Sequence, residues 1–196
     1  MIDWILELDK ELFLFLNGLH ADCADPIIES LSGRWIWVPL YAFLLFLIFR
    51  QYGLQGFWFL LVIAVTITLS DQITSGFMKP FFERLRPSRD ESLEGLVHIV
   101  NGYRGGKFGF ASSHAANSFA IATLMFHLLR NKHGWIKWMF LWAAIVSYTR
   151  IYLGVHYPLD ILAGAGIGVL IAWTGIFICR RSGLLGTGAS LQDPVQ

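Results

Sequence analysis

Five apolar runs of nearly membrane-spanning length divide this chain of 196 residues. They cover residues 26–50, 57–78, 112–129, 135–153 and 158–179. A helix needs roughly 20 apolar residues to cross a bilayer core of about 30 Å. The sequence therefore predicts an all-α membrane protein with a bundle of about five transmembrane helices. Gly164, Gly166 and Gly168 in the last run are expected to allow close helix packing.

The composition also favours a membrane protein and excludes several other classes. Hydrophobic residues make up 55% of the chain and charged residues 15%, against about 25% charged residues in soluble domains. The 15 lysines and arginines nearly balance the 14 acidic residues, so there is no basic excess for binding nucleic acid. Cys23 and Cys179 fall on opposite faces of the predicted bundle, which excludes a disulfide between them. A disordered chain and a disulfide-stapled miniprotein are excluded as well.

The predicted organisation is a single integral-membrane domain over residues 1–196. Residues 1–20 are expected to form an amphipathic helix in the membrane interface, because four charged residues share one helical face. These are Asp3, Glu7, Lys10 and Glu11. Residues 26–180 form the predicted helical core and residues 181–196 a flexible tail. The start of the chain has no basic segment before an apolar run, so we expect no cleavable signal peptide.

The number of spans decides which loops share a membrane face. Loops 79–111 and 150–157 are separated by two spans and must open on the same side. The opposite side carries Arg50, Arg130, Lys132, Lys137, Arg180 and Arg181. The positive-inside rule places that side in the cytoplasm and the two polar loops outside. A plain count of cations gives the reverse orientation, but cations that bind an anion are not topology signals.

Two cations follow the end of the second run, at the start of the long polar loop. Lys79 ends the run, and Arg86 with Pro87 follows after six residues. Cations beside a bilayer face water, lipid head groups or a bound anion. Snorkelling toward head groups is the alternative to anion binding for each of them.

The segment Ala111-Ser112-Ser113-His114 precedes the third run. Ser112 or Ser113 can cap that helix and leave backbone N–H groups and the positive dipole end facing the loop. Helix N-termini of this kind bind phosphate. His114 at this position can exchange a proton with a bound group. The alternative is an ordinary N-cap followed by an incidental histidine.

A third cluster comprises Arg150, His156 and Asp160 around the start of the last run. Pro158 marks the first turn of that helix, which puts Asp160 in the turn and His156 just before it. An aspartate so placed can accept a hydrogen bond from one imidazole nitrogen and direct the other nitrogen's lone pair outward, as beside activated nucleophiles. Helix-dipole compensation by Asp160 and a capped loop histidine are the alternatives.

All three clusters belong to the same predicted membrane face. Two histidines and one aspartate surrounded by three cations suit an anion and repel a metal ion. We therefore expect no metal and no cofactor.

The spacing of the three clusters resembles the three motifs of the type 2 phosphatidic acid phosphatases. The resemblance covers residues 79–160 and implies the all-helical fold that this family shares with vanadium haloperoxidases. Two of the motifs depart from the family pattern. In the second, Ala111 and Ser113 replace the usual proline and glycine. Thr149 replaces the usual serine before the third-motif arginine. The added side chain of Ser113 lies where backbone approaches phosphate, so rate or substrate geometry can differ.

The resemblance also implies a mechanism and residue roles. His156 would attack phosphorus to form a phosphohistidine, Asp160 would orient it, and His114 would protonate the leaving oxygen. The phosphoryl oxygens would be held by Lys79, Arg86, Ser112, Ser113 and Arg150. The enzyme would be a metal-independent phosphatase in the bacterial inner membrane, with its site facing the periplasm or the outside.

The expected substrate is a lipid phosphate or diphosphate drawn from the surrounding membrane lipids. The resemblance favours undecaprenyl diphosphate in the cell envelope, with phosphatidylglycerol phosphate, phosphatidic acid and lipid A phosphate as alternatives. Head-group choice is assigned to the remaining side chains of the long loop. These are Glu83, Arg84, Arg89, Tyr103, Arg104 and Lys107. The sequence carries no signal for an oligomeric state.

Three alternatives from other classes remain at this stage. An anion transporter would use intramembrane cations, but it needs no His–Asp pair, and the chain has no inverted repeat. A lipid-binding protein without catalysis is compatible with Ser113. A haloperoxidase would share the pocket, but that class is soluble and five spans argue against it.

Overall fold

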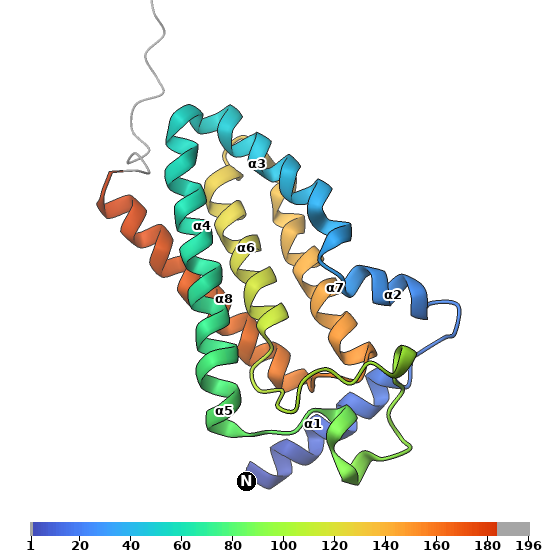
Figure 1. The fold of residues 1–196 in the computed structure, drawn as a ribbon. Helices are drawn as coiled ribbons and strands as arrows, with labels where there is room; N and C mark the ends of the chain where they lie inside the picture. Colours follow the sequence, from blue (N-terminus) through green and yellow to red (C-terminus); the bar gives the residue numbers. More distant parts are fainter. Residues whose placement is uncertain (1, 184–196) are drawn as a thin grey trace, which may run out of the picture.

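The computed structural model describes residues 2–183, which are helical with no strand (Figure 1). The helices are α1 (Ile2–Asn17), α2 (Asp25–Ser32), α3 (Val38–Tyr52), α4 (Gly56–Asp71), α5 (Lys79–Phe82), α6 (Ser113–Leu129), α7 (Met139–Tyr152) and α8 (Pro158–Arg181). A π-helical turn over Gln72–Met78 joins α4 to α5. Most of the predicted tail, residues 184–196, lies outside the described residues.

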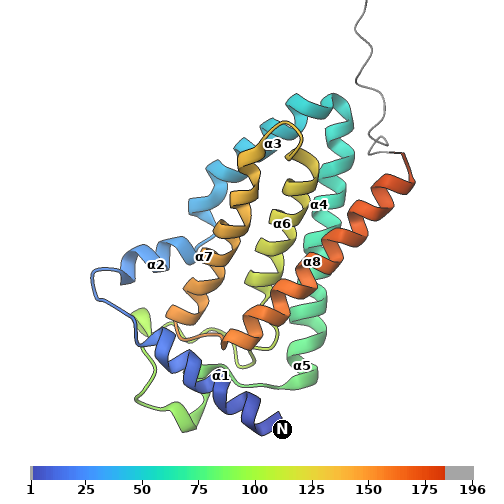
Figure 2. The same ribbon diagram turned by 180° about the vertical axis from the view of Figure 1, so that it is seen from behind.

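Helix α6 occupies the centre of the bundle and packs against α3, α4, α7 and α8. The α6–α7 turn lies at one end of the bundle in both views (Figures 1 and 2). The α5–α6 loop, the α7–α8 turn and α1 gather at the other end. The two polar loops therefore share one end, as the number of predicted spans requires.

The first apolar run, 26–50, is expected to form one helix, but the structure divides it into α2 and α3. Helix α2 stops at Gly33, whose backbone is extended (φ −74°, ψ 151°). Helix α3 starts afresh with Pro39 in its first turn, a position where the missing N–H of proline does no harm. The indole Nε1 of Trp37 donates to the Leu31 carbonyl across the break at 2.8 Å. Glycine and proline thus divide the run into two helices.

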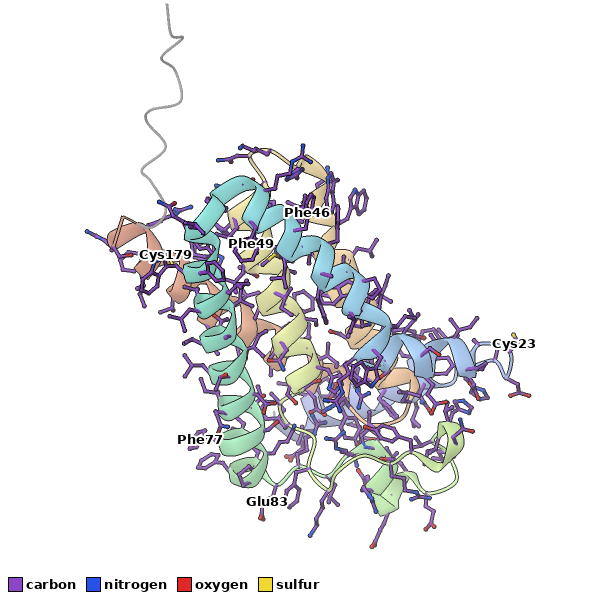
Figure 3. The ribbon with its side chains drawn as sticks, turned by 45° about the horizontal axis from the view of Figure 1, so that its top comes forward. Cys23, Phe46, Phe49, Phe77, Glu83 and Cys179 are labelled. Atoms are coloured by element: carbon purple, nitrogen blue, oxygen red, sulfur yellow. The ribbon has the colours of Figure 1, made fainter. Side chains whose placement is uncertain are left out.

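Two segments, Trp35–Phe82 and Pro158–Arg181, are long and apolar enough to cross a membrane. The first of them contains α3 and α4, which are joined by a short turn at Gly53–Gln55. Large apolar side chains such as Phe46 and Phe77 are exposed on the outside of the bundle (Figure 3). Leu61 and Trp173 are exposed as well. An apolar exterior of this extent fits contact with lipid rather than water.

Small residues bring α6 and α8 together. A Cβ atom at Gly164 would overlap the Ser112 carbonyl, and one at Gly168 would overlap the Ala116 carbonyl. The third glycine, Gly166, has no atom within 4 Å of a Cβ position, so it plays no part in this contact. Close packing at two of the three predicted glycines sets the first turn of α8 against the start of α6.

Helix α1 packs against the end of the bundle through one face, which carries both polar and apolar side chains. Asp9, Phe13 and Asn17 recur at helical spacing and are buried. The Asn17 amide donates to the carbonyls of Ile151 and Tyr152 at 3.1 and 2.9 Å. The buried contacts of α1 are therefore made by residues other than those of the charged face predicted from the sequence. Its location in the membrane interface stays a prediction.

Replacing Gly168 with alanine should destabilise the bundle, since the new Cβ overlaps the backbone of α6. Overpacked sites lose about 1–3 kcal/mol, so the melting temperature in detergent should fall. Gly166→Ala is the matched control, because alanine favours helices and meets no neighbour there. Equal melting temperatures for the two variants would contradict the packing described here.

Candidate active site

The candidate site lies at the end of the bundle where the two polar loops meet. The amide of Ser88 in the long loop donates to the Gly154 carbonyl in the α7–α8 turn at 2.9 Å. Cys23 marks this end of the molecule and Cys179 lies far from it (Figure 3). Both cysteines are free, which agrees with their predicted separation.

A buried His–Asp pair stands at the start of α8. Pro158 begins the helix, and the Asp160 carboxylate accepts the Tyr157 backbone N–H at 3.0 Å, which fixes the carboxylate in the first turn. The same oxygen, Oδ2, lies 3.3 Å from Nδ1 of His156. The two side chains are 0% and 1% exposed. A proton held on Nδ1 by this contact leaves the Nε2 lone pair available for chemistry.

Burial lowers the pKa of His156 well below its ordinary value of 6.5. The nearby cations Arg86, Arg150 and Lys79 lower it further, because a second positive charge is unfavourable there. The imidazole is therefore neutral at pH 7, which is the form that a nucleophile or base requires.

Lys79 is held by hydroxyl groups from two helices. Its Nζ donates to Ser75 Oγ at 3.0 Å and to Ser113 Oγ at 3.2 Å. Ser75 in turn donates to Asp71 at 3.2 Å. The π-helical turn between Asp71 and Lys79 shifts the helix register, a device that is frequent at functional sites. Ser113, which departs from the family pattern, thus helps to fix the ammonium group.

Arg86 is buried and anchored by backbone carbonyls. Its Nε donates to the Phe108 carbonyl at 3.1 Å, and Nη1 donates to the Val155 carbonyl at 3.4 Å. Burial lowers the pKa of the guanidinium, and the neighbouring Arg150 lowers it further. Gly105 (φ +62°) lies so close that a Cβ there would be 2.7 Å from Nη1. The glycine lets the loop pass directly over the guanidinium.

Arg150 projects from the end of α7 and is fixed on two sides. It donates to the Ser32 hydroxyl from the α2–α3 break and to the Tyr103 hydroxyl at 3.1 Å. Its Nε is buried and has no hydrogen-bond partner among residues 2–183. A buried guanidinium with an unpaired donor suits an anionic ligand.

Ser112 and His114 occupy the start of α6. Ser112 is the N-cap, its hydroxyl accepts the Ala115 amide at 3.5 Å, and its side chain is fully buried. Its own backbone N–H donates to the Asp160 carbonyl at 2.9 Å. His114 lines two cavities of about 220 Å³ each, one of which also contacts Arg150. The His114 imidazole therefore borders the space beside Arg150. Burial and the nearby cations lower its pKa to about 3, because a further positive charge is unfavourable there.

The structure thus brings every predicted site residue to one end of the bundle. Within residues 2–183 no group of three or more His, Cys, Asp or Glu side chains is placed to hold a metal ion. Three cations and a helix N-terminus have the charge that suits an oxyanion, and the buried neutral imidazole beside them has the chemistry of a nucleophile or base.

Some loop residues assigned to head-group choice make contacts that hold the loop and the site together. Arg104 donates to the Ser88 carbonyl at 3.0 Å, and Arg89 donates to the Gly105 carbonyl at 3.3 Å. Arg84 pairs with Asp160 at 2.8 Å, which the sequence analysis missed because no local pattern links the two.

The comparisons agree with this geometry. The sequence profile of the PAP2 superfamily matches residues 55–181. A lipid A 4'-phosphatase of Bacteroides thetaiotaomicron is 42% identical over 92% of this chain and 81% of that protein. An undecaprenyl-diphosphatase of Sulfolobus acidocaldarius is 28% identical over 86% of this chain and 77% of that protein.

A solved structure, the crystal structure of Aquifex aeolicus LpxE, superimposes with a TM-score of 0.66 and 28% identity. The match covers 87% of this chain and 95% of that one. The predicted all-α membrane fold of the phosphatase and haloperoxidase type is confirmed.

His156 should stay neutral at pH 6.5, because its pKa lies well below that value. NMR of the protein with ¹⁵N-labelled histidine in detergent measures its titration, with the His156→Gln spectrum giving the assignment. A His156 signal that titrates at or above pH 6.5 would contradict the buried, cation-flanked site.

Proposed function

Since the chain belongs to the PAP2 superfamily, whose motifs it carries, we propose that this lipid phosphatase hydrolyses a phosphate monoester of a lipid A-type glycolipid through a phosphohistidine intermediate. The single observation that carries the mechanism is the buried contact between His156 Nδ1 and Asp160 Oδ2 at 3.3 Å. The substrate class rests on the similarity to the lipid A 4'-phosphatase.

The proposed reaction has two steps. In the first, Nε2 of His156 attacks phosphorus, the bond from phosphorus to the lipid oxygen breaks, and His114 gives that oxygen a proton. In the second, His114 takes a proton from water, the resulting hydroxide attacks phosphorus and the N–P bond breaks. Inorganic phosphate leaves, and His156 returns to its neutral form.

The cations supply the electrostatic part of the proposal. Lys79, Arg86 and Arg150 would hold the equatorial phosphoryl oxygens as charge is redistributed in the transition state. The hydroxyl of Ser113 keeps Lys79 in place, and the N-terminus of α6 adds a positive dipole end. Ser112 and the backbone N–H of Ser113 are proposed to complete the phosphate site.

Undecaprenyl diphosphate, the substrate favoured by the sequence analysis, remains the second candidate. The similarity to an undecaprenyl-diphosphatase supports it, but at 28% identity, against 42% for the lipid A 4'-phosphatase. A site that binds one phosphoryl group between three cations is compatible with both head groups and does not distinguish them. The higher sequence identity to the lipid A 4'-phosphatase is therefore what favours the glycolipid.

His156→Gln should abolish turnover, because the amide cannot form the phosphoryl intermediate. We expect phosphate release to fall about 10⁴-fold, as when a member of a nucleophilic triad is lost. Phosphate release by the purified protein in detergent measures this, with His133→Gln at the far end of the bundle as the control. Wild-type activity should survive EDTA. Activity near the wild-type level in His156→Gln would end the assignment.

The substrate is tested in the same assay with lipid A, undecaprenyl diphosphate and phosphatidic acid as separate substrates. The proposal expects the highest kcat/KM for lipid A. A higher kcat/KM for undecaprenyl diphosphate would replace the glycolipid by the second candidate without affecting the mechanism.

We also propose that the site faces away from the cytoplasm, in the inner membrane of a bacterium. Arg130 and Lys132 in the α6–α7 turn, with Arg181 at the end of α8, lie at the opposite end. A membrane-impermeant maleimide should therefore label exposed Cys23 in intact spheroplasts, with buried Cys179 as the internal control. Labelling of Cys23 in inverted vesicles alone would reverse the orientation.

A further inference from the structure

Asp160 is connected to helix α1 through its second carboxylate oxygen and the guanidinium of Arg84. Oδ2 serves His156, and Oδ1 accepts from Nη1 of Arg84 at 2.8 Å. The other nitrogen of the same guanidinium, Nη2, donates to Oδ2 of Asp9 at 2.6 Å. A continuous series of polar contacts therefore runs from α1 through Arg84 and Asp160 to the imidazole that the proposed function makes the nucleophile.

The burial and the hydrogen bonds of Asp9 distinguish it from an incidental surface contact. Its side chain is 2% exposed, although it lies on a helix whose neighbouring side chains are largely exposed. Its Oδ1 accepts the backbone N–H of Leu159 at 2.8 Å. Leu159 lies in the first turn of α8, where N–H groups have no partner within the helix. Asp9 thus binds both Arg84 and the helix turn that carries Asp160.

A second set of contacts fixes the same guanidinium. The Arg84 guanidinium carbon lies 4.1 Å from the centre of the Tyr157 ring. The Tyr157 hydroxyl donates to Asp90 at 2.8 Å, and Lys10, the neighbour of Asp9, lies 3.5 Å from the same carboxylate. Helix α1 therefore supports the position of Arg84 from two adjacent residues.

The charges explain why a second carboxylate is needed. Arg84 alone would neutralise Asp160 and weaken its attraction for the positive charge that His156 acquires when its nitrogen bonds to phosphorus. With Asp9 on the other side, one guanidinium is shared between two carboxylates, and the group keeps a net negative charge beside the imidazole. Because the two carboxylates are buried and Arg84 is only 18% exposed, their interaction is screened less than at the surface.

From this geometry we propose that Asp9 is a positioning residue of the active site, which acts through Arg84 to hold Asp160 and keep its charge available to His156. The proposal rests on the proposed function. It assigns a role in turnover to a helix that lies outside residues 55–181, the part matched by the superfamily profile.

Asp9→Asn is the informative substitution, because the amide oxygen can still accept from Leu159 while the charge is lost. We expect kcat to fall about tenfold, the lower range for residues that orient a functional group from outside, with KM unchanged within error. Glu7→Gln is the matched control, since it removes the same charge from an exposed position on the same helix. Its kcat should equal that of the wild type.

Two further measurements separate positioning from folding. The inhibition constant of inorganic phosphate should be the same in wild type and Asp9→Asn, because Asp9 does not contact the proposed phosphate-binding cations. In an Arg84→Gln background, Asp9→Asn should lower kcat no further, since its effect passes through Arg84.

The proposal is overturned if Asp9→Asn and Glu7→Gln have the same kcat. It is equally overturned if kcat falls only together with the melting temperature and the affinity for phosphate, since that pattern marks a structural role. The proposed function fails separately, if wild type releases no phosphate or if His156→Gln keeps its activity.

Discussion

The structure of the site depends on one buried carboxylate, that of Asp160. A charged group without exposure to water is strongly unfavourable unless its oxygens are hydrogen-bonded. Asp160 meets this requirement with the Tyr157 N–H, the Arg84 guanidinium and the His156 ring. Its backbone carbonyl also accepts the N–H of Ser112. One residue thus joins the start of α8, the long loop, the α7–α8 turn and the start of α6.

Helix packing makes this junction possible. Gly164 and Gly168 let α8 approach the backbone of α6 within a distance that any side chain would prevent. The start of α6, with its capping Ser112 and the adjacent His114, is therefore set beside Asp160. The break at Gly33 has a related effect, because it turns α2 away and brings Ser32 to the guanidinium of Arg150. The apolar bundle fixes the positions of charged groups that lie at its end.

The sequence predicted the parts of the fold that depend on local pattern. Four of the five apolar runs contain the helices α4, α6, α7 and α8, and the cap at Ser112 and the proline start of α8 lie where the sequence placed them. The break in run 26–50 was missed, because hydropathy over a long window outweighs a single Gly33. The sequence also predicted that the three motifs share one end of the bundle, because each lies beside the end of an apolar run and the number of spans between them puts those ends on the same side.

Contacts between distant segments could not be predicted in the same way. Arg84 and Asp160 are 76 residues apart, and Leu159 and Asp9 are 150 apart. Only the packing of α1 against the loop brings them together, and the amphipathic pattern of α1 favoured its other, charged face. The sequence signal that was available is the spacing of Asp9, Phe13 and Asn17, which marks one buried face of the helix.

The central claim is that His156 carries the phosphoryl group during turnover. The most direct measurement is rapid quenching of the wild-type enzyme with a ³²P-labelled lipid phosphate under alkaline conditions, where phosphohistidine is stable, followed by peptide mapping. The account predicts label on the peptide that contains His156 and its absence from the other histidine-containing peptides. Turnover without label on any peptide, or label on the His114 peptide, would contradict it.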